Sequence, residues 1–133
     1  MRALRVLIIE DQPLIALLFE EVLSEMGHDV CARECTQAGA IAAAARCQPE
    51  LIIADVALQE GSGIDAMKCI MATGFIPHLF ISGSLLNRST LNPAAGVLQK
   101  PFSDRWLIKA IEHAIAPETV LIGENYEKTR RQS

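Results

Sequence analysis

Polar residues that could do chemistry follow short apolar segments at four places in the sequence. They are Glu10 and Asp11 after the first segment, and Asp55, Ser82 and Lys100 after three later ones. Three carboxylates held together repel one another and favour a bound cation, and carboxylate oxygens with room for water suit Mg²⁺. An ammonium group and a hydroxyl group beside them can hold an anion. This combination is typical of a phosphoryl-transfer site in which Asp55 is the nucleophile.

Taken singly, these residues have ordinary structural explanations. An acid after a strand is often only a helix cap, and Lys100 could be a surface lysine in water. The order of all five along the chain is harder to ascribe to coincidence. In a doubly wound parallel sheet, ligand sites lie outside the carboxyl ends of the strands, so we expect the five residues to meet in one cleft.

The elements that must position these residues alternate between strand-like and helix-like segments. Short apolar runs predict five strands, at Leu4–Ile9, His28–Ala32, Leu51–Ala54, His78–Ile81 and Gly96–Gln99. Start signals predict four helices, which begin at Pro13, after Thr36, near Ile64 and after Ser103. Strands that alternate with helices predict an α/β fold, an open five-stranded parallel sheet with helices on both faces.

Apolar residues recur at helical spacing within the predicted helices. In the first helix they are Leu14, Leu17, Leu18, Val22 and Met26. In the last helix, the apolar face includes Trp106 at its beginning.

Length and composition predict a single soluble domain. The chain has 133 residues, 50% of them hydrophobic, and a formal net charge of −4. A mildly acidic chain without a Lys/Arg run is a poor candidate for binding nucleic acid or anionic lipid. Its apolar stretches are too short to cross a bilayer, and no signal-peptide pattern is present. We therefore expect a cytoplasmic protein with a domain at residues 1–116 and a tail at 117–133.

The four cysteines, Cys31, Cys35, Cys47 and Cys69, form no metal-binding or Cys-x-x-Cys pattern. Their neighbours are apolar or small. We expect buried or half-buried free thiols in a reducing compartment, without metal or redox chemistry.

Five motifs in this order resemble the receiver domains of two-component response regulators. They are Val-Leu-Ile-Ile-Glu10-Asp11, Pro49-Glu-Leu-Ile-Ile-Ala-Asp55, Gly61-Ser-Gly-Ile-Asp65, Phe80-Ile-Ser82-Gly83 and Leu98-Gln-Lys100-Pro101-Phe102. The resemblance covers roughly Leu4 to Ala116. It implies a flavodoxin-like doubly wound sheet with the strand order 2-1-3-4-5, and a cis bond between Lys100 and Pro101.

The resemblance also implies a role for each site residue. Asp55 is expected to be the phosphoacceptor. Asp11 and Asp55 are expected to bind Mg²⁺ directly, Glu10 through water, and Ala57 through its backbone carbonyl.

On the phosphoryl side, the resemblance implies that Lys100 pairs with the phosphoryl oxygens. Ser82 is expected to move toward them and donate a hydrogen bond. The backbone groups of Ala57 and Gly83 are expected to line the same site.

The sequence departs from the receiver pattern at two places. Receivers carry Tyr or Phe three residues before the lysine, where this chain has Val97, so the usual aromatic switch cannot operate. The segment Ser84–Ala95 replaces the fourth helix, and Asn87, Asn92 and Pro93 within it are poor helix residues. We expect a short or irregular fourth helix, which could become ordered on phosphorylation.

The expected partner is a sensor histidine kinase or a histidine phosphotransfer protein, with output by protein contact or phosphate transfer. We expect no DNA binding, no membrane, a monomer or weak homodimer, and no enzymatic turnover of external substrates. One alternative is a receiver-like binding module that is not phosphorylated. The other is a phosphatase with an aspartate nucleophile of the haloacid dehalogenase type, but its general acid would stand where this chain has Ala57.

Overall fold

Residues 2–116 are described in the computed structural model, and within them five parallel strands form one sheet in the order β2-β1-β3-β4-β5. The strands are β1 (Arg5–Ile9), β2 (Asp29–Glu34), β3 (Leu51–Asp55), β4 (His78–Ser82) and β5 (Gly96–Gln99). The helices are α1 (Pro13–Glu25), α2 (Gln37–Cys47), α3 (Gly63–Ile70) and α4 (Asp104–Ile115), with the 3₁₀ turns η1 (Met71–Thr73) and η2 (Arg88–Thr90). The α/β class and the flavodoxin-like strand order are confirmed.

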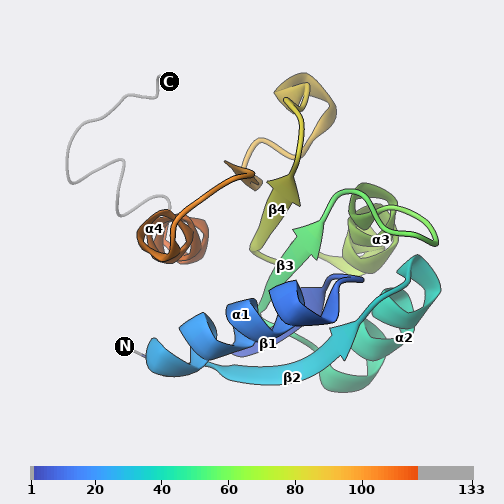
Figure 1. Cartoon of the computed structure of the whole chain (residues 1–133). Helices are drawn as coiled ribbons and strands as arrows, with labels where there is room; N and C mark the ends of the chain where they lie inside the picture. Colours follow the sequence, from blue (N-terminus) through green and yellow to red (C-terminus); the bar gives the residue numbers. More distant parts are fainter. Residues whose placement is uncertain (1, 117–133) are drawn as a thin grey trace.

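The sheet is covered on both faces (Figure 1), because each central strand is apolar on both sides. On β1, Val6 and Ile8 pack with α1 and α4, whereas Leu7 and Ile9 pack with α2 and α3. The core is therefore split by the sheet into two layers. None of the helices in the described part of the chain is long and apolar enough to span a membrane.

Side-chain caps begin the helices at the predicted places. Thr36 Oγ1 accepts a hydrogen bond from Gly39 N–H at 3.0 Å, and Ser103 Oγ accepts one from Trp106 N–H at 3.3 Å. The predicted caps at Thr36 and Ser103 are confirmed. The predicted tail, residues 117–133, lies outside the described residues.

Three apolar residues that helical spacing placed on the buried faces of their helices are exposed. Leu14 is 80% exposed, Leu17 is 43% exposed and Trp106 is 61% exposed. Of the predicted face of α1, Val22 is buried and Leu18 and Met26 pack against the core, and the other buried residues of this helix are Ala16, Phe19 and Leu23. Because α1 is apolar around most of its circumference, spacing alone selects no single face.

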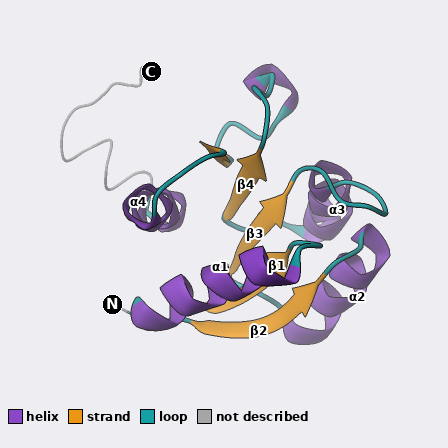
Figure 2. Cartoon of the chain, viewed as in Figure 1, coloured by secondary structure: helices purple, strands orange, loops and turns teal. Residues whose placement is uncertain are grey.

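The segment Ser84–Ala95 is irregular, as predicted. Its only helical piece is the three-residue turn η2, and Figure 2 shows the rest of the connection between β4 and β5 as loop. Arg88 Nη2 donates to the Ala95 carbonyl oxygen at 2.6 Å and connects the turn η2 to the last residue of the segment. The prediction of a short or irregular element here is confirmed.

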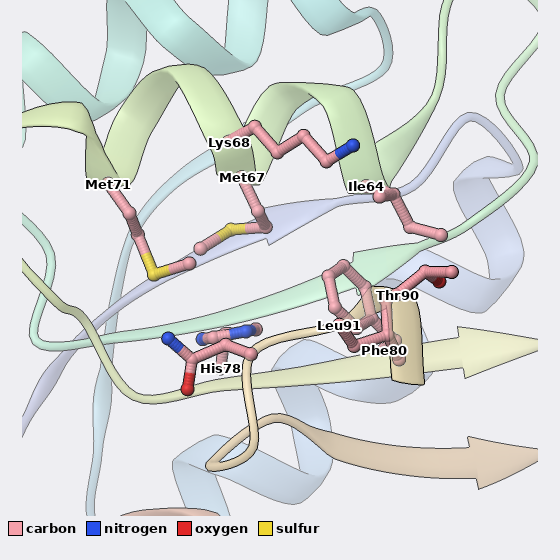
Figure 3. Close-up of a pocket in the computed structure, with 9 residues that line it drawn as sticks. Ile64, Met67, Lys68, Met71, His78, Phe80, Thr90 and Leu91 are labelled. Carbon is pink, nitrogen blue, oxygen red and sulfur yellow. The ribbon is translucent and has the colours of Figure 1, made fainter. Parts of the chain in front are cut away.

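A small pocket of about 40 Å³ separates this segment from α3 (Figure 3). Met67 and Met71 line one side and Thr90 and Leu91 the other, with His78 on the floor. His78 Nδ1 donates to the Ile76 carbonyl oxygen at 2.7 Å, and burial lowers the pKa of this histidine, which therefore stays neutral. Around this small cavity, Leu86 and Leu91 of the segment pack in the same apolar cluster as Met67 of α3.

Candidate functional site

The carboxyl ends of the strands bring the predicted site residues to one edge of the sheet. Asp55 is the last residue of β3, and Ser82 is the last residue of β4. Glu10 follows β1 and Lys100 follows β5, where its N–H donates to the Ser82 carbonyl oxygen at 2.7 Å. The neighbouring strands are in register at these positions, with Asp55 opposite Ile81. The predicted convergence is confirmed.

Three acids form a cluster at this edge. One carboxylate oxygen from each of Glu10, Asp11 and Asp55 lies within 4.8 Å of the others. Asp55 is 3% exposed and Glu10 is 4% exposed. Two nearly buried carboxylates beside a third repel one another strongly, so a cation is the natural complement of the cluster.

The pKa of Glu10 is shifted by its surroundings in the cluster. Burial raises the pKa of Glu10 to about 7, and although a hydrogen bond from Gln12 N–H opposes the shift, the neighbouring Asp55 adds to it. Glu10 Oε2 accepts that bond at 3.1 Å, while Oε1 is buried without a hydrogen-bond partner among the described residues. An unpaired buried oxygen in an acidic cluster fits the donor set of a hard divalent cation.

Lys100 supplies the positive charge of the site. Its Nζ lies 2.9 Å from Asp55 Oδ2, in a hydrogen-bonded ion pair. Partial burial lowers the pKa of Lys100, but the contact with Asp55, aided by Glu10 and Asp11, outweighs that effect and raises it. Lys100 therefore stays charged and offsets part of the repulsion among the acids.

The loop after β3 is bonded directly to the acids. Asp55 Oδ1 accepts a hydrogen bond from Ala57 N–H at 2.9 Å, and Asp11 Oδ2 accepts one from Gln59 N–H at 2.7 Å. At the start of α3, a β-carbon on Gly63 would collide with the Asp55 carbonyl oxygen. The backbone therefore passes close behind Asp55, and only glycine fits there.

Gln37 is a positioning residue that sequence reasoning missed. Its N–H donates to the Glu60 carbonyl oxygen at 3.1 Å, and its Oε1 accepts from Ser62 N–H at 3.0 Å. These bonds tie the loop after β3 to the start of α2. A glutamine in the first turn of a helix has no pattern that predicts such a contact.

Ser82 is buried at the same edge, but its hydroxyl bonds within its own turn. Oγ donates to the Ser84 carbonyl oxygen at 2.6 Å and accepts from Ser84 N–H at 3.1 Å. Gly83 between them has open space around it. The Lys100–Pro101 bond is cis, as the resemblance implied. The structure therefore gathers every predicted site residue at one edge, while their individual roles stay predictions.

The sequence also matches known proteins. The profile of the response regulator receiver domain family covers residues 6–112. The phyllosphere-induced regulator PhyR of Methylorubrum extorquens is 36% identical over an alignment of 119 residues, and the match covers 85% of this chain and 44% of that protein. The transcriptional regulatory protein PdtaR of Mycobacterium tuberculosis is 34% identical over 84% of this chain and 57% of that protein. The chain thus spans about half the length of these relatives.

Solved structures agree with these matches. The PhyR response regulator receiver domain of Erythrobacter litoralis has a TM-score of 0.77 and 31% identity, over 96% of both chains. The response regulator PhyR from Brucella abortus has a TM-score of 0.80 and 34% identity, over 89% of this chain and 50% of that one.

Proposed function

Because this chain belongs to the response regulator receiver domain family, we propose that Asp55 accepts a phosphoryl group from a phosphohistidine in a two-component phosphorelay. The observation that carries this proposal is the contact of 2.9 Å between Lys100 Nζ and Asp55 Oδ2 inside the acidic cluster. A nearly buried carboxylate with a cation on one side and two further acids on the other is suited to phosphoryl transfer.

We infer that the acidic cluster holds Mg²⁺. Asp11 and Asp55 would provide carboxylate oxygens, Ala57 its carbonyl oxygen, and Glu10 a contact through water. The unpaired buried oxygen of Glu10 and the small, hard oxygen donors fit this ion. When bound, Mg²⁺ supplies positive charge that offsets the charge of the phosphoryl oxygens.

The protein's own residues would then act on the phosphoryl group in turn. A carboxylate oxygen of Asp55 attacks the phosphorus, the bond between phosphorus and the donor histidine nitrogen breaks, and the imidazole leaves as it takes up a proton. Lys100 passes from the Asp55 carboxylate to a phosphoryl oxygen. Ser82 and the Gly83 N–H donate further hydrogen bonds as the turn to Ser84 opens.

A protein partner is supported by apolar residues beside the cluster. Leu14 and Leu17 lie on α1, which begins just after Asp11, and both are exposed. Exposed leucines next to a charged site favour docking of an apolar helix face. We infer that a kinase or phosphotransfer protein covers them, and that output proceeds through protein contacts. One structural relative is described as an anti-anti-sigma factor, PhyR from Bartonella quintana.

The other functions considered above are disfavoured by specific residues. Ala57 offers no general acid where a phosphatase with an aspartate nucleophile needs one. A binding module that is not phosphorylated does not require Lys100 to be held against the buried carboxylate of Asp55.

Incubation of the full chain with acetyl phosphate and Mg²⁺ tests the proposal. Intact mass should rise by one phosphoryl group, and Asp55→Asn should abolish the rise. Asp65→Asn, which removes an acid of α3 outside the cluster, is the matched control and should keep it. A folded protein that stays unmodified would point to the binding module, and steady release of phosphate with continued turnover of a phosphomonoester would point to the phosphatase.

A further inference from the structure

His78 is a buried histidine for which the proposed function has no role. It is the first residue of β4 and is 1% exposed. Its Nδ1 donates to the Ile76 carbonyl oxygen at 2.7 Å, so in the neutral ring Nε2 carries no proton and has a free lone pair. Nε2 is buried and has no hydrogen-bond partner within residues 2–116. Because buried acceptors are nearly always paired, this lone pair favours a bound ligand.

The ring of His78 faces the layer of the core that contains α3. Side chains alternate along a strand, so His78 and Phe80 share a face of β4, and their rings meet edge to face with centroids 5.1 Å apart. Phe80 packs in the same apolar cluster as Met67 and Met71. Phe75 lies against the imidazole as well, with a centroid distance of 5.7 Å. Contacts with two aromatic rings and one hydrogen bond hold the imidazole in one orientation.

Two methionines lie across a small cavity from this ring. Met67 is in α3 and Met71 begins the turn η1 directly after it, so the two residues are about one helical turn apart and share a side of the helix. Both line the cavity of about 40 Å³, and His78 lines it from β4. Figure 3 shows the two methionine side chains extending from the helix toward His78, with both sulfur atoms on the side of the ring. This volume accommodates a small ion or a few water molecules.

From this arrangement we propose that Met67, Met71 and His78 form a binding site for a soft monovalent metal cation, Cu(I). The ligands are the two thioether sulfur atoms and His78 Nε2. Thioether sulfur selects Cu(I), and imidazole also suits copper. The hydrogen bond from Nδ1 to the backbone fixes the tautomer that leaves Nε2 available to a metal, which is the usual arrangement around metal-bound histidines.

The residues around the cavity disfavour other common metal ions. Of the described residues, none that lines it is acidic or a cysteine, whereas Mg²⁺ and Ca²⁺ take oxygen ligands and Zn²⁺ is bound by Cys, His and carboxylates. A single positive charge also costs less to bury in apolar surroundings than a double one. Lys68 lines the cavity too, but Figure 3 shows its ammonium group directed away from His78. Thr90 and Asn92 line the cavity and are exposed, so the cavity lies close to solvent.

Cysteine thiolates also bind soft cations, so the test has to distinguish them from the proposed site. Cys35 and Cys69 are exposed, and the expectation of buried or half-buried thiols is therefore wrong for those two. Cys31 and Cys47 are half-buried, as expected. Replacing Cys35 and Cys69 by serine removes the exposed thiols, of which Cys69 lies between the two methionines in the sequence. The methionine methyl groups then report on the proposed site directly, whatever the half-buried thiols bind.

Titration with Cu(I) in oxygen-free buffer tests the proposal on the full chain with Cys35→Ser and Cys69→Ser, labelled with ¹³C at the methionine methyl groups. The methyl signals of Met67 and Met71 should shift together as the site fills. The signal of Met26, which packs in the opposite layer of the core, should stay in place. In the natural chain, the same shifts are expected after the four thiols are saturated.

Two matched variants in this background decide the outcome. Met71→Leu keeps the apolar volume but removes one sulfur atom, so the Cu(I) concentration needed to shift the Met67 signal should rise by roughly tenfold or more. Met26→Leu is the control and should leave that concentration unchanged. The proposal is overturned if the Met67 and Met71 signals of the folded chain stay in place up to excess Cu(I), or if Met26 shifts with them. It is also overturned if Met71→Leu leaves the affinity measured at Met67 unchanged.

Discussion

Ser82 Oγ donates a hydrogen bond to the carbonyl oxygen of Ser84 at 2.6 Å, and the Ser84 N–H returns one to the same oxygen at 3.1 Å. The hydroxyl at the end of β4 is thus bound into the turn that opens the segment Ser84–Ala95. Moving this hydroxyl toward Asp55 must break both bonds. We therefore predict that the turn opens when the hydroxyl moves, which would couple the site to the segment.

Ser82→Ala should separate phosphorylation from the response of the segment. Asp55 should still be modified, but amide exchange across 84–95, which we predict to slow in the natural chain carrying a beryllofluoride mimic, should no longer change. Loss of the hydroxyl should lower the free energy of unfolding by about 1 kcal/mol. Ser84→Ala is the matched control, because Ser84 bonds Ser82 through backbone atoms alone. If amide exchange across 84–95 still slows in Ser82→Ala, the conformational change does not depend on the Ser82 hydroxyl.

Lys100→Ala should bind Mg²⁺ at least as well as the natural chain. Removing one cation near the cluster changes the electrostatic energy by about 1 kcal/mol, or roughly fivefold in affinity. Asp55→Asn should weaken binding because it removes a ligand. Titration calorimetry measures both, and Lys109→Ala, which removes a lysine beside Trp106 instead, serves as the control. Weaker binding in Lys100→Ala would contradict the arrangement.

Gly63→Ala should destabilise the fold, since the added β-carbon meets the carbonyl oxygen of Asp55. Overpacking against backbone of this kind costs about 1–3 kcal/mol. Gly83→Ala is the control, because its β-carbon would meet no atom within 4 Å, and it should stay within about 0.5 kcal/mol of the natural chain. Urea unfolding compares the two, and equal stabilities would show that the backbone behind Asp55 has room to move.

Glu10 should make the metal-free protein less stable as the pH rises. Its pKa is about 7 in the folded protein against an ordinary value of 4.5. Between these values the folded protein binds more protons than the unfolded one, so the free energy of unfolding falls with rising pH. The full effect is about 3 kcal/mol. Glu10→Gln should remove this part of the slope in urea unfolding with a chelator present, and parallel slopes would refute the assignment.

The positions of the site residues were predictable because they depend on simple rules. Asp55 and Ser82 end buried apolar runs, and in a parallel sheet such ends share one edge. Strand β2 was predicted less well, with its end at Ala32 instead of Glu34. The omitted residues, Arg33 and Glu34, are charged and so lie outside the apolar run, and a shift of the register of β2 against β1 between Val30 and Ala32 also interrupts the alternation of side chains that marks a strand.

Contacts between segments distant in sequence could not be predicted in the same way. Gln37 bonds a loop more than twenty residues away, and Gly63 matters only because α3 begins against Asp55. Both depend on how α2 and α3 pack on the sheet. The exposure of Leu14 was also not predictable, since residues 13–19 of α1 are all apolar and tertiary packing decides which of them are buried.

We predict that Asp55, among the three acids of the cluster, accepts the phosphoryl group. Borohydride reduction after treatment with acetyl phosphate and Mg²⁺ identifies the modified acid, because borohydride converts an aspartyl phosphate into homoserine. Trypsin separates peptide 47–68, which contains Asp55, from peptide 6–33, which contains Glu10 and Asp11. We expect homoserine at position 55 in the fragment spectrum of peptide 47–68. A reduced acid in peptide 6–33, or none in either peptide of a folded protein, would contradict it.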